Sequence, residues 1–494
     1  MVLCILIVFK IHRTSMKEAF IRKTKDNNQE KTKQSIVMVE TIQRKLSDSP
    51  KARWTALIIV AFTMMMGYFL TDVMSPLEAL LETPKAQGGL GWTSSNYGFF
   101  AGSYGLINVF LLMLFFGGII LDKMGIRFTG VMACSLMVAG VAIKYFGVST
   151  DFGDSVFSIS AFNFSLPMSA AVASLGYAIF GVGCEICGIT VSKVITKWFT
   201  GHELALAMGI QVALARLGTA GAMMGSLPFA KAMGGHVSAP VLLGLVLLII
   251  GLLAFIVYTV MDKKLDASTE AVEGQNTADS EDEGFRFSDL KFIFSNPGFW
   301  CITTLCLLFY SGVFPFLKFA TKLMIANYNV SDTFAGVLPG LIPFGTILLT
   351  PLFGTLYDRI GKGATLMLIG STMLTCVHFI FMIHILPVGW FAVVIMLVLG
   401  VAFSLVPSAM WPSVPKIIPM KLLGSAYAII FYIQNIGLSL VPMAVGSFNK
   451  NDPSYFSMEA FFTSCGVAAI VVSLVLIVID KKKKYGLQEA NIKK

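Results

Sequence analysis

Hydrophobic residues in this chain are grouped into long blocks, and polar residues separate the blocks. About 20 consecutive apolar residues are long enough to span the hydrocarbon core of a bilayer as an α-helix. Helical geometry is required there, because lipid offers the backbone no hydrogen-bond partners. The pattern predicts twelve transmembrane helices, centred on residues 54–74, 97–121, 127–147, 170–193, 204–229, 238–261, 298–324, 333–356, 363–385, 388–411, 422–446 and 458–480.

Composition agrees with a membrane protein and excludes an ordinary soluble one. The 494 residues are 56% hydrophobic and only 13% charged, whereas soluble domains contain roughly a quarter charged residues. The net charge of +9 lies in the gaps between the apolar blocks. This placement argues against a nucleic-acid partner, since cytoplasmic loops of membrane proteins collect Lys and Arg.

Polar segments divide the predicted helices six and six. The acidic stretch DASTEAVEGQNTADSEDEG predicts a flexible linker, and the FRFSDLKFIF segment after it suits an interfacial helix. For the first residues we expect a cytoplasmic tail without a cleavable signal peptide. The predicted parts are a tail at 1–50, a bundle at 51–261, a linker at 262–297, a bundle at 298–481 and a basic tail at 482–494.

The distribution of Lys and Arg predicts the orientation of the chain. With both termini in the cytoplasm, the cytoplasmic segments hold 30 of the 37 basic residues. The external segments then hold only Lys85, Lys231 and Lys450. Such a bias follows the positive-inside rule, so we expect both termini in the cytoplasm.

Residues typical of catalytic or metal sites are scarce. The eight cysteines are scattered, and Cys184 with Cys187 forms a single CxxC pair, which we interpret as ordinary buried thiols. The chain contains five histidines and no HExxH, P-loop or Ser-His-Asp pattern. We therefore expect neither an enzyme nor a receptor without transport, and no metal or other cofactor.

One short motif occurs twice, at matching places in the two halves. GGIILDKMGIRFTG lies between the second and third helices, and FGTLYDRIGKGAT between the eighth and ninth. The glycine before each aspartate is expected to let two helices approach closely. The motif residues are Gly118, Asp122, Lys123, Gly125 and Arg127 in the first copy, and Gly354, Asp358, Arg359, Gly361 and Lys362 in the second.

This repeat resembles the loop signature of the major facilitator superfamily. The resemblance implies an all-α membrane protein with two six-helix bundles, related by a pseudo-two-fold axis along the membrane normal. It also implies a central substrate site and alternating access.

Glu185 and Arg216 are the strongest candidates for substrate binding. A charge inside the membrane costs at least a few kcal/mol, so it needs a partner or a function. Both residues lie at similar depth on the fourth and fifth predicted helices, roughly 15–20 Å from the cytoplasmic side at 1.5 Å per residue. They suit a structural salt bridge, or a clamp in which Arg216 binds a carboxylate and Glu185 an ammonium group.

Asp72 and Lys318 form a second predicted pair. They lie near the outer ends of the first and seventh helices, which are equivalent under the six-plus-six repeat. We expect an outer-gate ion pair. The alternative is that Lys318 and Lys322 extend to the membrane interface while Asp72 caps a helix end.

Further polar and aromatic side chains are predicted to line the cavity. Gln434 and Asn435 interrupt an apolar helix, where they would bind a peptide-like ligand or hold helices together. Trp411, near the cytoplasmic end of its helix, is a candidate gate. The other predicted lining residues are Tyr68, Tyr104, Asn108, Gln211, Tyr310 and Tyr432.

Three longer stretches narrow the resemblance to one branch. They are GYFLTDVMSPL, KWFTGHELALAMGIQVALARLG and WPSVPKIIPMKLLGSAYAIIFYIQNIGLSLVP. Together they are similar to the lysosomal dipeptide uniporters of the superfamily and their bacterial relatives. The branch implies transport of short peptides with free termini, and its intramembrane acid, arginine and aspartate match Glu185, Arg216 and Asp72.

Two transport hypotheses follow. The first is a carrier of dipeptides or similar zwitterions, either a uniporter or coupled to protons through Glu185 and Asp72. The second is a carrier of organic or inorganic anions such as monocarboxylates or nitrate, which the cations Arg216, Lys318 and Lys322 favour.

The expected partners are a small-molecule substrate, the lipid bilayer and, as a candidate co-substrate, protons. A monomer or weak homodimer is expected. Because no lysosomal targeting signal is evident in the N-terminal tail, the sequence favours a bacterial plasma membrane, with a lysosomal membrane as the alternative.

Overall fold

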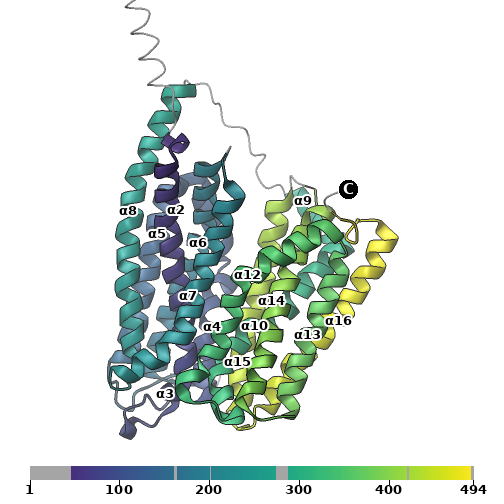
Figure 1. The fold of residues 1–494 in the computed structure, drawn as a ribbon. Helices are drawn as coiled ribbons and strands as arrows, with labels where there is room; N and C mark the ends of the chain where they lie inside the picture. The colour runs from purple at the N-terminus through teal and green to yellow at the C-terminus, as the bar shows by residue number, and fades with distance from the viewer. Residues whose placement is uncertain (1–45, 161–163, 201, 274–286, 420–421, 491–494) are drawn as a thin grey trace, which may run out of the picture. The chain divides into compact units, whose positions relative to one another are not determined.

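The computed structural model describes residues 46–160, 164–200, 202–273, 287–419 and 422–490. Their helices run largely side by side, and Figure 1 shows α2 to α8 gathered in one group and α10 to α16 in another. The first-half elements are η1 Leu46–Asp48, α2 Pro50–Asp72, η2 Ser75–Leu77, α3 Glu78–Glu82, η3 Lys85–Gln87, α4 Ser94–Phe110, α5 Met113–Ser149, β1 Val156–Ile159, β2 Phe164–Pro167, α6 Met168–Phe199, α7 Leu204–Ala232 and α8 Ser238–Glu273.

The second half contains helices alone among its described residues. They are α9 Phe287–Phe294, α10 Pro297–Tyr328, α11 Asp332–Ala335, α12 Val337–Ile360, α13 Gly363–Ile383, α14 Gly389–Ile417, α15 Leu423–Asn449 and α16 Phe456–Lys483. Helix α9 coincides with the predicted interfacial segment.

All twelve predicted transmembrane helices are present in the described residues. Eleven helical segments are long and apolar enough to cross a membrane. The second predicted helix is divided, because α4 ends at Phe110 and Leu112 has left-handed backbone (φ 52°) before α5 begins. Helix α5 then continues through Gly125, whose φ of 76° separates the rest of the second helix from the third. Glycine allows this conformation because it has no Cβ.

Small residues allow helices of the two halves to pack closely. Helix α4 packs on α15 and helix α7 on α12. A Cβ placed on Gly98 of α4 would lie 2.7 Å from the Cα of Gly446 in α15. Only glycine permits this approach, as in other membrane helix contacts. The contact fixes the faces of α4 and α15 that border the cavity described below.

The described residues fall into two compact units. Residues 46–55 and 260–273 belong to the smaller one, and the remainder to the larger one. Within the smaller unit, the Leu46 backbone N–H donates to Ser268 Oγ at 3.0 Å. Helix α8 continues to Glu273, beyond the predicted linker start at 262. The KKLDASTEAVE segment is rich in helix-forming residues, which accounts for the longer helix.

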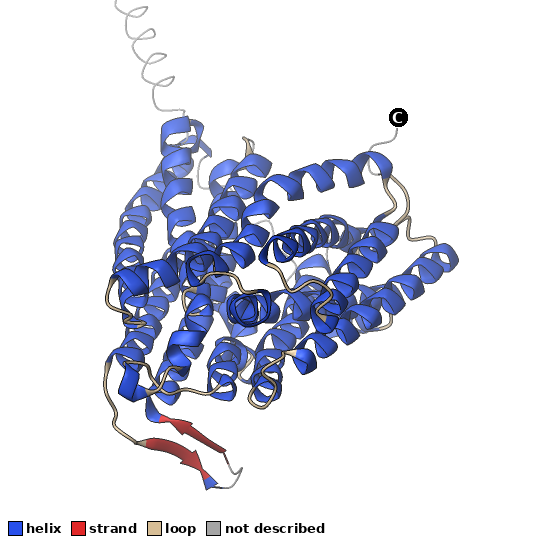
Figure 2. Cartoon of the chain, turned by 60° about the horizontal axis from the view of Figure 1, so that its bottom comes forward, coloured by secondary structure: helices blue, strands red, loops and turns tan. Residues whose placement is uncertain are grey.

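Two short strands form the only sheet among the described residues. They pair antiparallel, with Val156 opposite Pro167 and Ile159 opposite Phe164. Figure 2 shows this hairpin standing out from the helix ends. The whole of β1 is exposed. The hairpin was not predicted from the sequence, because its strands are too short to appear as membrane-spanning apolar blocks.

Candidate functional site: a central cavity between the two helical bundles

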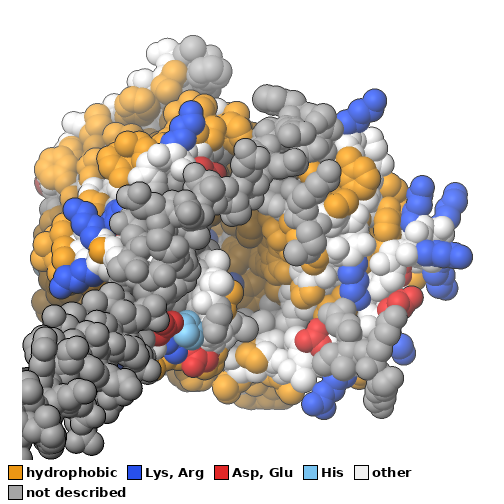
Figure 3. All heavy atoms as spheres, turned by 90° about the horizontal axis from the view of Figure 1, so that it is seen from above, with side chains coloured by type: hydrophobic (Ala, Val, Ile, Leu, Met, Phe, Trp, Pro, Cys, Tyr) orange, Lys and Arg blue, Asp and Glu red, His pale blue; other side chains and the backbone are white. Residues whose placement is uncertain are grey.

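A cavity of about 170 Å³ lies between helices of the two halves. Seven predicted residues border it, five named for substrate binding and two for gating. Viewed from the face that carries the C-terminus, the surface has a hollow lined by hydrophobic side chains (Figure 3). The cavity is lined by Tyr68, Thr71, Asp72, Ala101, Tyr104, Tyr177, Cys184, Glu185, Thr219, Phe314, Pro315, Lys318, Phe431, Gln434, Asn435, Leu438 and Pro442.

Glu185 places a carboxyl group on the cavity wall. It lies in the middle of α6, and Tyr104 of α4 donates a hydrogen bond to its Oε1 at 2.9 Å. Tyr104 also borders the cavity and packs on the ring of Tyr177 at 5.4 Å. This hydrogen bond orients the carboxyl group and leaves the other oxygen available to a cationic group.

Arg216 does not form a salt bridge with Glu185 among the described residues, so the structure does not contain the first of the two arrangements that the sequence left open. Its guanidinium lies over the rings of Phe403 and Phe314, with its central carbon 5.2 and 5.8 Å from their centroids. Cation–π contacts of this kind contribute about 0.5–2 kcal/mol, less than a desolvated carboxylate would. Tyr68, on the cavity wall, interacts electrostatically with both Arg216 and Glu185. Arg216 is not one of the lining residues, but it contacts Phe314, which is, so it lies next to the cavity.

Asp72 and Lys318 pair as predicted. Lys318 Nζ lies 2.7 Å from Asp72 Oδ1, and each side chain is 12% exposed. The same ammonium donates to the Thr71 carbonyl at 2.8 Å, while Tyr177 donates to that carbonyl at 2.5 Å. The last carbonyls of a helix have no partner within it. These donors therefore complete the end of α2 and connect it to α10.

Lys144 is a further cation at the same helix end. It is fully buried on α5, and its Nζ donates to the Leu70 carbonyl at 2.8 Å. The ammonium also lies 4.9 Å from the ring centre of Tyr177 and 5.4 Å from that of Phe180. No role for Lys144 was predicted from the sequence.

Lys322 is held by acidic residues instead of extending freely to the interface. Its Nζ forms an ion pair with Glu82 of α3 and lies 3.6 Å from Glu78 Oε1. Ser94 donates to Glu82 at 2.6 Å. Lys231 of α7 likewise pairs with Asp332 of α11. These pairs join the two halves on the side of α3 and α11, which is the predicted external side.

The two amides of α15 border the cavity. Gln434 Oε1 accepts from Cys306 Sγ at 3.5 Å, which leaves its amide nitrogen for a ligand. Asn435 Nδ2 donates to the Phe431 carbonyl one turn earlier, at 2.9 Å. Its Oδ1 is buried and has no partner within the described residues.

Five other predicted lining residues lie outside the cavity wall. Trp411 Nε1 donates to Tyr310 Oη at 3.2 Å, and the Trp411 ring stacks on Phe431 at 5.0 Å. Tyr432 donates to the Val109 carbonyl at 3.2 Å. The remaining residues in this group are Asn108, which is buried, and Gln211.

Several residues that shape the site were not predicted from the sequence, namely Tyr177, Phe314, Phe403 and Phe431. An aromatic residue in an apolar block gives the same signal whether it faces lipid, another helix or a cavity. The sequence signal that could have indicated Phe314 is its place one turn before Lys318 on the same helix.

The two loop motifs differ in their surroundings. In the first, Asp122 pairs with Lys193 of α6 at 2.6 Å. In the second, the backbone N–H groups of Lys362 and Gly363 donate to the carbonyls of Gln488 and Leu487, at 3.1 and 2.8 Å. The basic C-terminal tail therefore packs on the second loop.

The expected helix contact at the motif glycines is wrong for this structure. A Cβ added to Gly118 or to Gly354 would have no neighbour within 4 Å. Glycines elsewhere make close contacts between the halves, among them Gly98 and Gly446. Gly361 keeps the turn role, with a φ of 71°.

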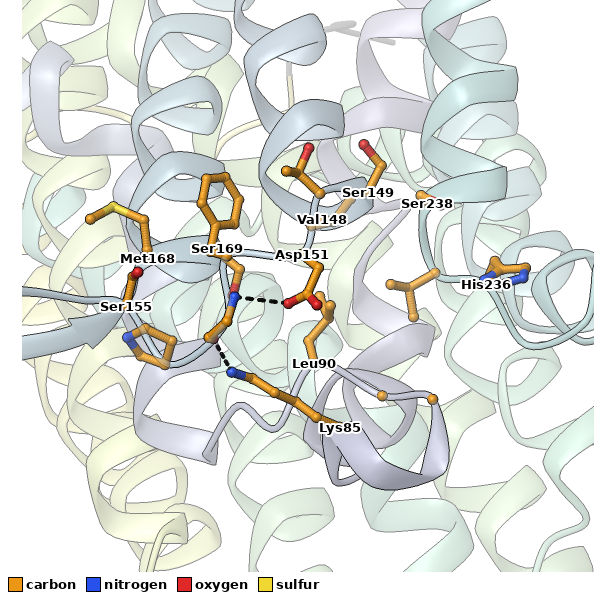
Figure 4. A pocket seen from close by; sticks show the side chains of 17 residues that line it. Lys85, Leu90, Val148, Ser149, Asp151, Ser155, Met168, Ser169, His236 and Ser238 are labelled. Carbon is orange, nitrogen blue, oxygen red and sulfur yellow. Dashed lines mark hydrogen bonds between the residues drawn. The ribbon is translucent and has the colours of Figure 1, made fainter.

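A larger cavity, of about 280 Å³, lies elsewhere, among loops that include residues 85–90 and 148–155. Lys85 donates to the Gly153 carbonyl, and Asp151 accepts from the Gly153 N–H at 2.9 Å (Figure 4). None of the predicted site residues lines this cavity. We assign the functional site to the smaller central cavity, because charged groups of both halves converge there.

Twelve membrane helices in two groups, with a cavity between them that is lined by apolar side chains and a few charged ones, are typical of a membrane transporter. A family model described as Major Facilitator Superfamily matches residues 1–177 and 152–442. The chain therefore belongs to the major facilitator superfamily, whose members are transporters and not enzymes.

Curated relatives and solved structures agree with this assignment. The chain is 24% identical over 446 residues to a Homo sapiens protein named lysosomal dipeptide transporter MFSD1, covering 88% of this chain and 87% of that protein. The Gallus gallus protein of the same name is 27% identical over 353 residues, covering 70% and 76%.

Two solved structures illustrate the shared fold. The inward-open xylose transporter XylE from E. coli has a TM-score of 0.65 at 15% identity and covers 86% of this chain and 95% of its own. A POT family transporter in complex with 5-aminolevulinic acid has a TM-score of 0.64 at 13% identity, with coverage of 88% and 97%. At these identities the likeness establishes the fold alone.

Proposed function

We propose that this protein transports small zwitterionic solutes of the dipeptide type by alternating access. One observation carries the proposal: the cavity region holds a carboxyl group and a guanidinium that do not neutralise each other. Glu185 is bound by Tyr104, and Arg216 by the aromatic rings of Phe314 and Phe403. A ligand with a free ammonium and a free carboxylate complements both groups.

The amide side chains support a peptide-like substrate. Gln434 keeps an amide nitrogen, and Asn435 a buried oxygen without a partner in the described part of the chain. A peptide bond supplies one acceptor and one donor to such groups. The relatives named dipeptide transporters are consistent with this substrate class.

The anion-carrier alternative has less support than the sequence suggested. It depended on an excess of intramembrane cations, yet Lys318 is paired with Asp72 and Lys322 with Glu82. Of the three cations that favoured this alternative, Arg216 is then the one without a carboxylate partner in the described residues, and Glu185 on the cavity wall would repel an anion.

The proposed location is a membrane with both termini on its cytoplasmic side, as the distribution of basic residues indicates. Of the two compartments that the sequence left open, the names of the vertebrate relatives favour a lysosomal membrane over a bacterial plasma membrane. A fluorescent fusion in the native organism tests this choice directly.

Exchange of a labelled dipeptide in reconstituted liposomes tests the proposed function. Vesicles preloaded with unlabelled dipeptide should accumulate external label, and Arg216→Ala vesicles should not. Lys450→Ala is the matched control, because Lys450 is an exposed cation that follows α15. Exchange of a monocarboxylate without any exchange of dipeptide would support the anion alternative and reject the proposal.

A further inference from the structure

A histidine and a glutamate are buried together inside the second bundle, outside the central cavity. His378 lies on α13 and Glu459 in the first turn of α16, and both side chains are 0% exposed. His378 Nδ1 lies 2.7 Å from Glu459 Oε2, and His378 Nε2 lies 3.0 Å from the Gly312 carbonyl oxygen of α10.

The geometry fixes how many protons these groups hold. A carbonyl oxygen can only accept, so Nε2 must carry a hydrogen that it donates to Gly312. The 2.7 Å contact between Nδ1 and Oε2 needs a second hydrogen, because a bare nitrogen lone pair and a bare carboxylate oxygen would repel each other. Whether nitrogen or oxygen carries it, the pair holds one proton more than a neutral histidine and an ionised glutamate.

The surroundings keep water away from this proton. The His378 ring packs against Phe316 at 5.0 Å and Phe462 at 5.1 Å between centroids. The other carboxyl oxygen, Glu459 Oε1, is buried and has no partner in the described residues. A net negative charge here would have neither solvent nor a second donor, and such burial is costly. The extra proton keeps the pair neutral overall.

Through Gly312, the His378–Glu459 pair also contacts α10, the helix that carries Lys318 of the outer ion pair. Gly312 lies three residues before Pro315, and Pro315 cannot donate the backbone hydrogen bond that would continue the helix. Helix α10 therefore lacks one backbone hydrogen bond close to Gly312, to which His378 is hydrogen-bonded. Lys318, which binds Asp72, follows Gly312 by six residues, about 9 Å along the helix.

We propose that His378 and Glu459 form a proton-binding site that fastens α10 to α13 and α16 in the conformation seen here. The ligand is a proton, bound between Nδ1 and Oε2. Its loss leaves two repelling acceptors and weakens the contact at Gly312. Acidic conditions therefore stabilise this arrangement of α10, in which the Asp72–Lys318 pair is closed.

The expected pH dependence follows from where the proton goes on unfolding. In an unfolded chain a histidine releases its proton at about pH 6.5. Above that pH the folded protein retains a proton that the unfolded chain lacks, so folded-state stability falls as pH rises. Among the described residues, the other titratable groups that interact with the pair are Tyr328 of α10 and His384 at the end of α13. Both are retained in every variant below.

Glu459→Gln removes the titratable proton and keeps the hydrogen bonds. Glutamine can donate from its amide nitrogen to Nδ1 while His378 still donates to Gly312, so both contacts remain without a titratable proton. Melting temperatures of purified wild type and Glu459→Gln should be compared from pH 5 to pH 9. As pH rises, wild type should lose stability relative to the variant. The ratio of their two unfolding equilibrium constants should change by up to about tenfold per pH unit.

Two further variants keep the test decisive. Glu489→Gln removes an exposed carboxylate and should melt in parallel with wild type at every pH. If Glu459→Gln does not fold, the apolar double variant His378→Leu/Glu459→Met replaces it and should likewise lack the alkaline loss of stability. A melting difference between wild type and the folded variant that is constant across the pH range overturns the proposal.

Discussion

Two sets of intramembrane charges have opposite surroundings in this protein. At the outer end, Asp72 and Lys318 are in direct contact at 2.7 Å and share the Thr71 carbonyl and Tyr177 as neighbours. Near the middle of α6 and α7, Glu185 and Arg216 contact aromatic side chains and not each other. The first set is satisfied by the protein itself, and the second retains binding capacity.

The difference suggests separate roles for the two sets. A buried pair that connects the two bundles stabilises one conformation, and breaking it by removing one partner costs about 3–5 kcal/mol. Charges that lack a charged partner are instead stabilised when a ligand supplies one. We therefore interpret the outer set as a gate and the inner set as the substrate site. The following substitutions test this division.

Loss of Arg216 should have the largest effect. Removing one partner of a desolvated charge pair costs about 2–5 kcal/mol, which corresponds to about 30-fold to several thousandfold. Arg216→Ala should abolish dipeptide uptake, and Arg216→Lys should impair it because a lysine cannot bind a carboxylate in bidentate geometry. Normal uptake and binding by Arg216→Ala would remove this residue from the site.

Reversal of one outer charge should have the next largest effect. Asp72→Lys places two cations in contact, and Lys318→Asp places two anions there, so either should lower uptake by at least about tenfold. The double swap should recover part of the loss, while equilibrium dipeptide binding changes little. Uptake by the swap that is no better than by the single variants would contradict a gating pair.

Glu185→Gln should weaken binding by about tenfold, since a hydrogen bond to a charged group contributes about 1–1.5 kcal/mol more than a neutral one. The loss should be specific for ligands with a free ammonium group. Competition binding with a dipeptide and its N-acetyl derivative measures this, and Glu489→Gln is the matched control. An equal loss for both ligands would mean that Glu185 does not bind the ammonium.

Trp411→Phe should have the smallest effect. The stacking on Phe431 would remain, while the hydrogen bond from Trp411 to Tyr310 would be lost. One neutral hydrogen bond contributes about 0.5–1.5 kcal/mol, so uptake should fall by about two- to tenfold. A complete loss of uptake would instead assign Trp411 a direct role at the site.

The sequence predicts the helices and the outer pair well, for physical reasons. Bilayer thickness fixes the length of a span, so apolar blocks alone identify the twelve helices. The internal repeat places Asp72 and Lys318 at equivalent depth, and an unpaired charge there would be costly. Their contact was therefore predictable without knowing how the helices are rotated.

The relation between Glu185 and Arg216 was not predictable in the same way. Depth along a helix does not specify the direction of a side chain, and here Arg216 faces two phenylalanines of the other half. Phenylalanines in apolar blocks carry no sign of such a role. The packing of Leu487 on the second loop was missed because few apolar residues lie beside the lysine run.

The most direct test of the account is equilibrium binding of matched ligands to the purified protein. Thermal stabilisation should be compared for a dipeptide, its N-acetyl form, its C-terminal amide and a monocarboxylate without an amino group. The account predicts that the free dipeptide stabilises the protein most and that capping either end removes most of the effect. Equal stabilisation by the monocarboxylate, with none by the dipeptide, would contradict it.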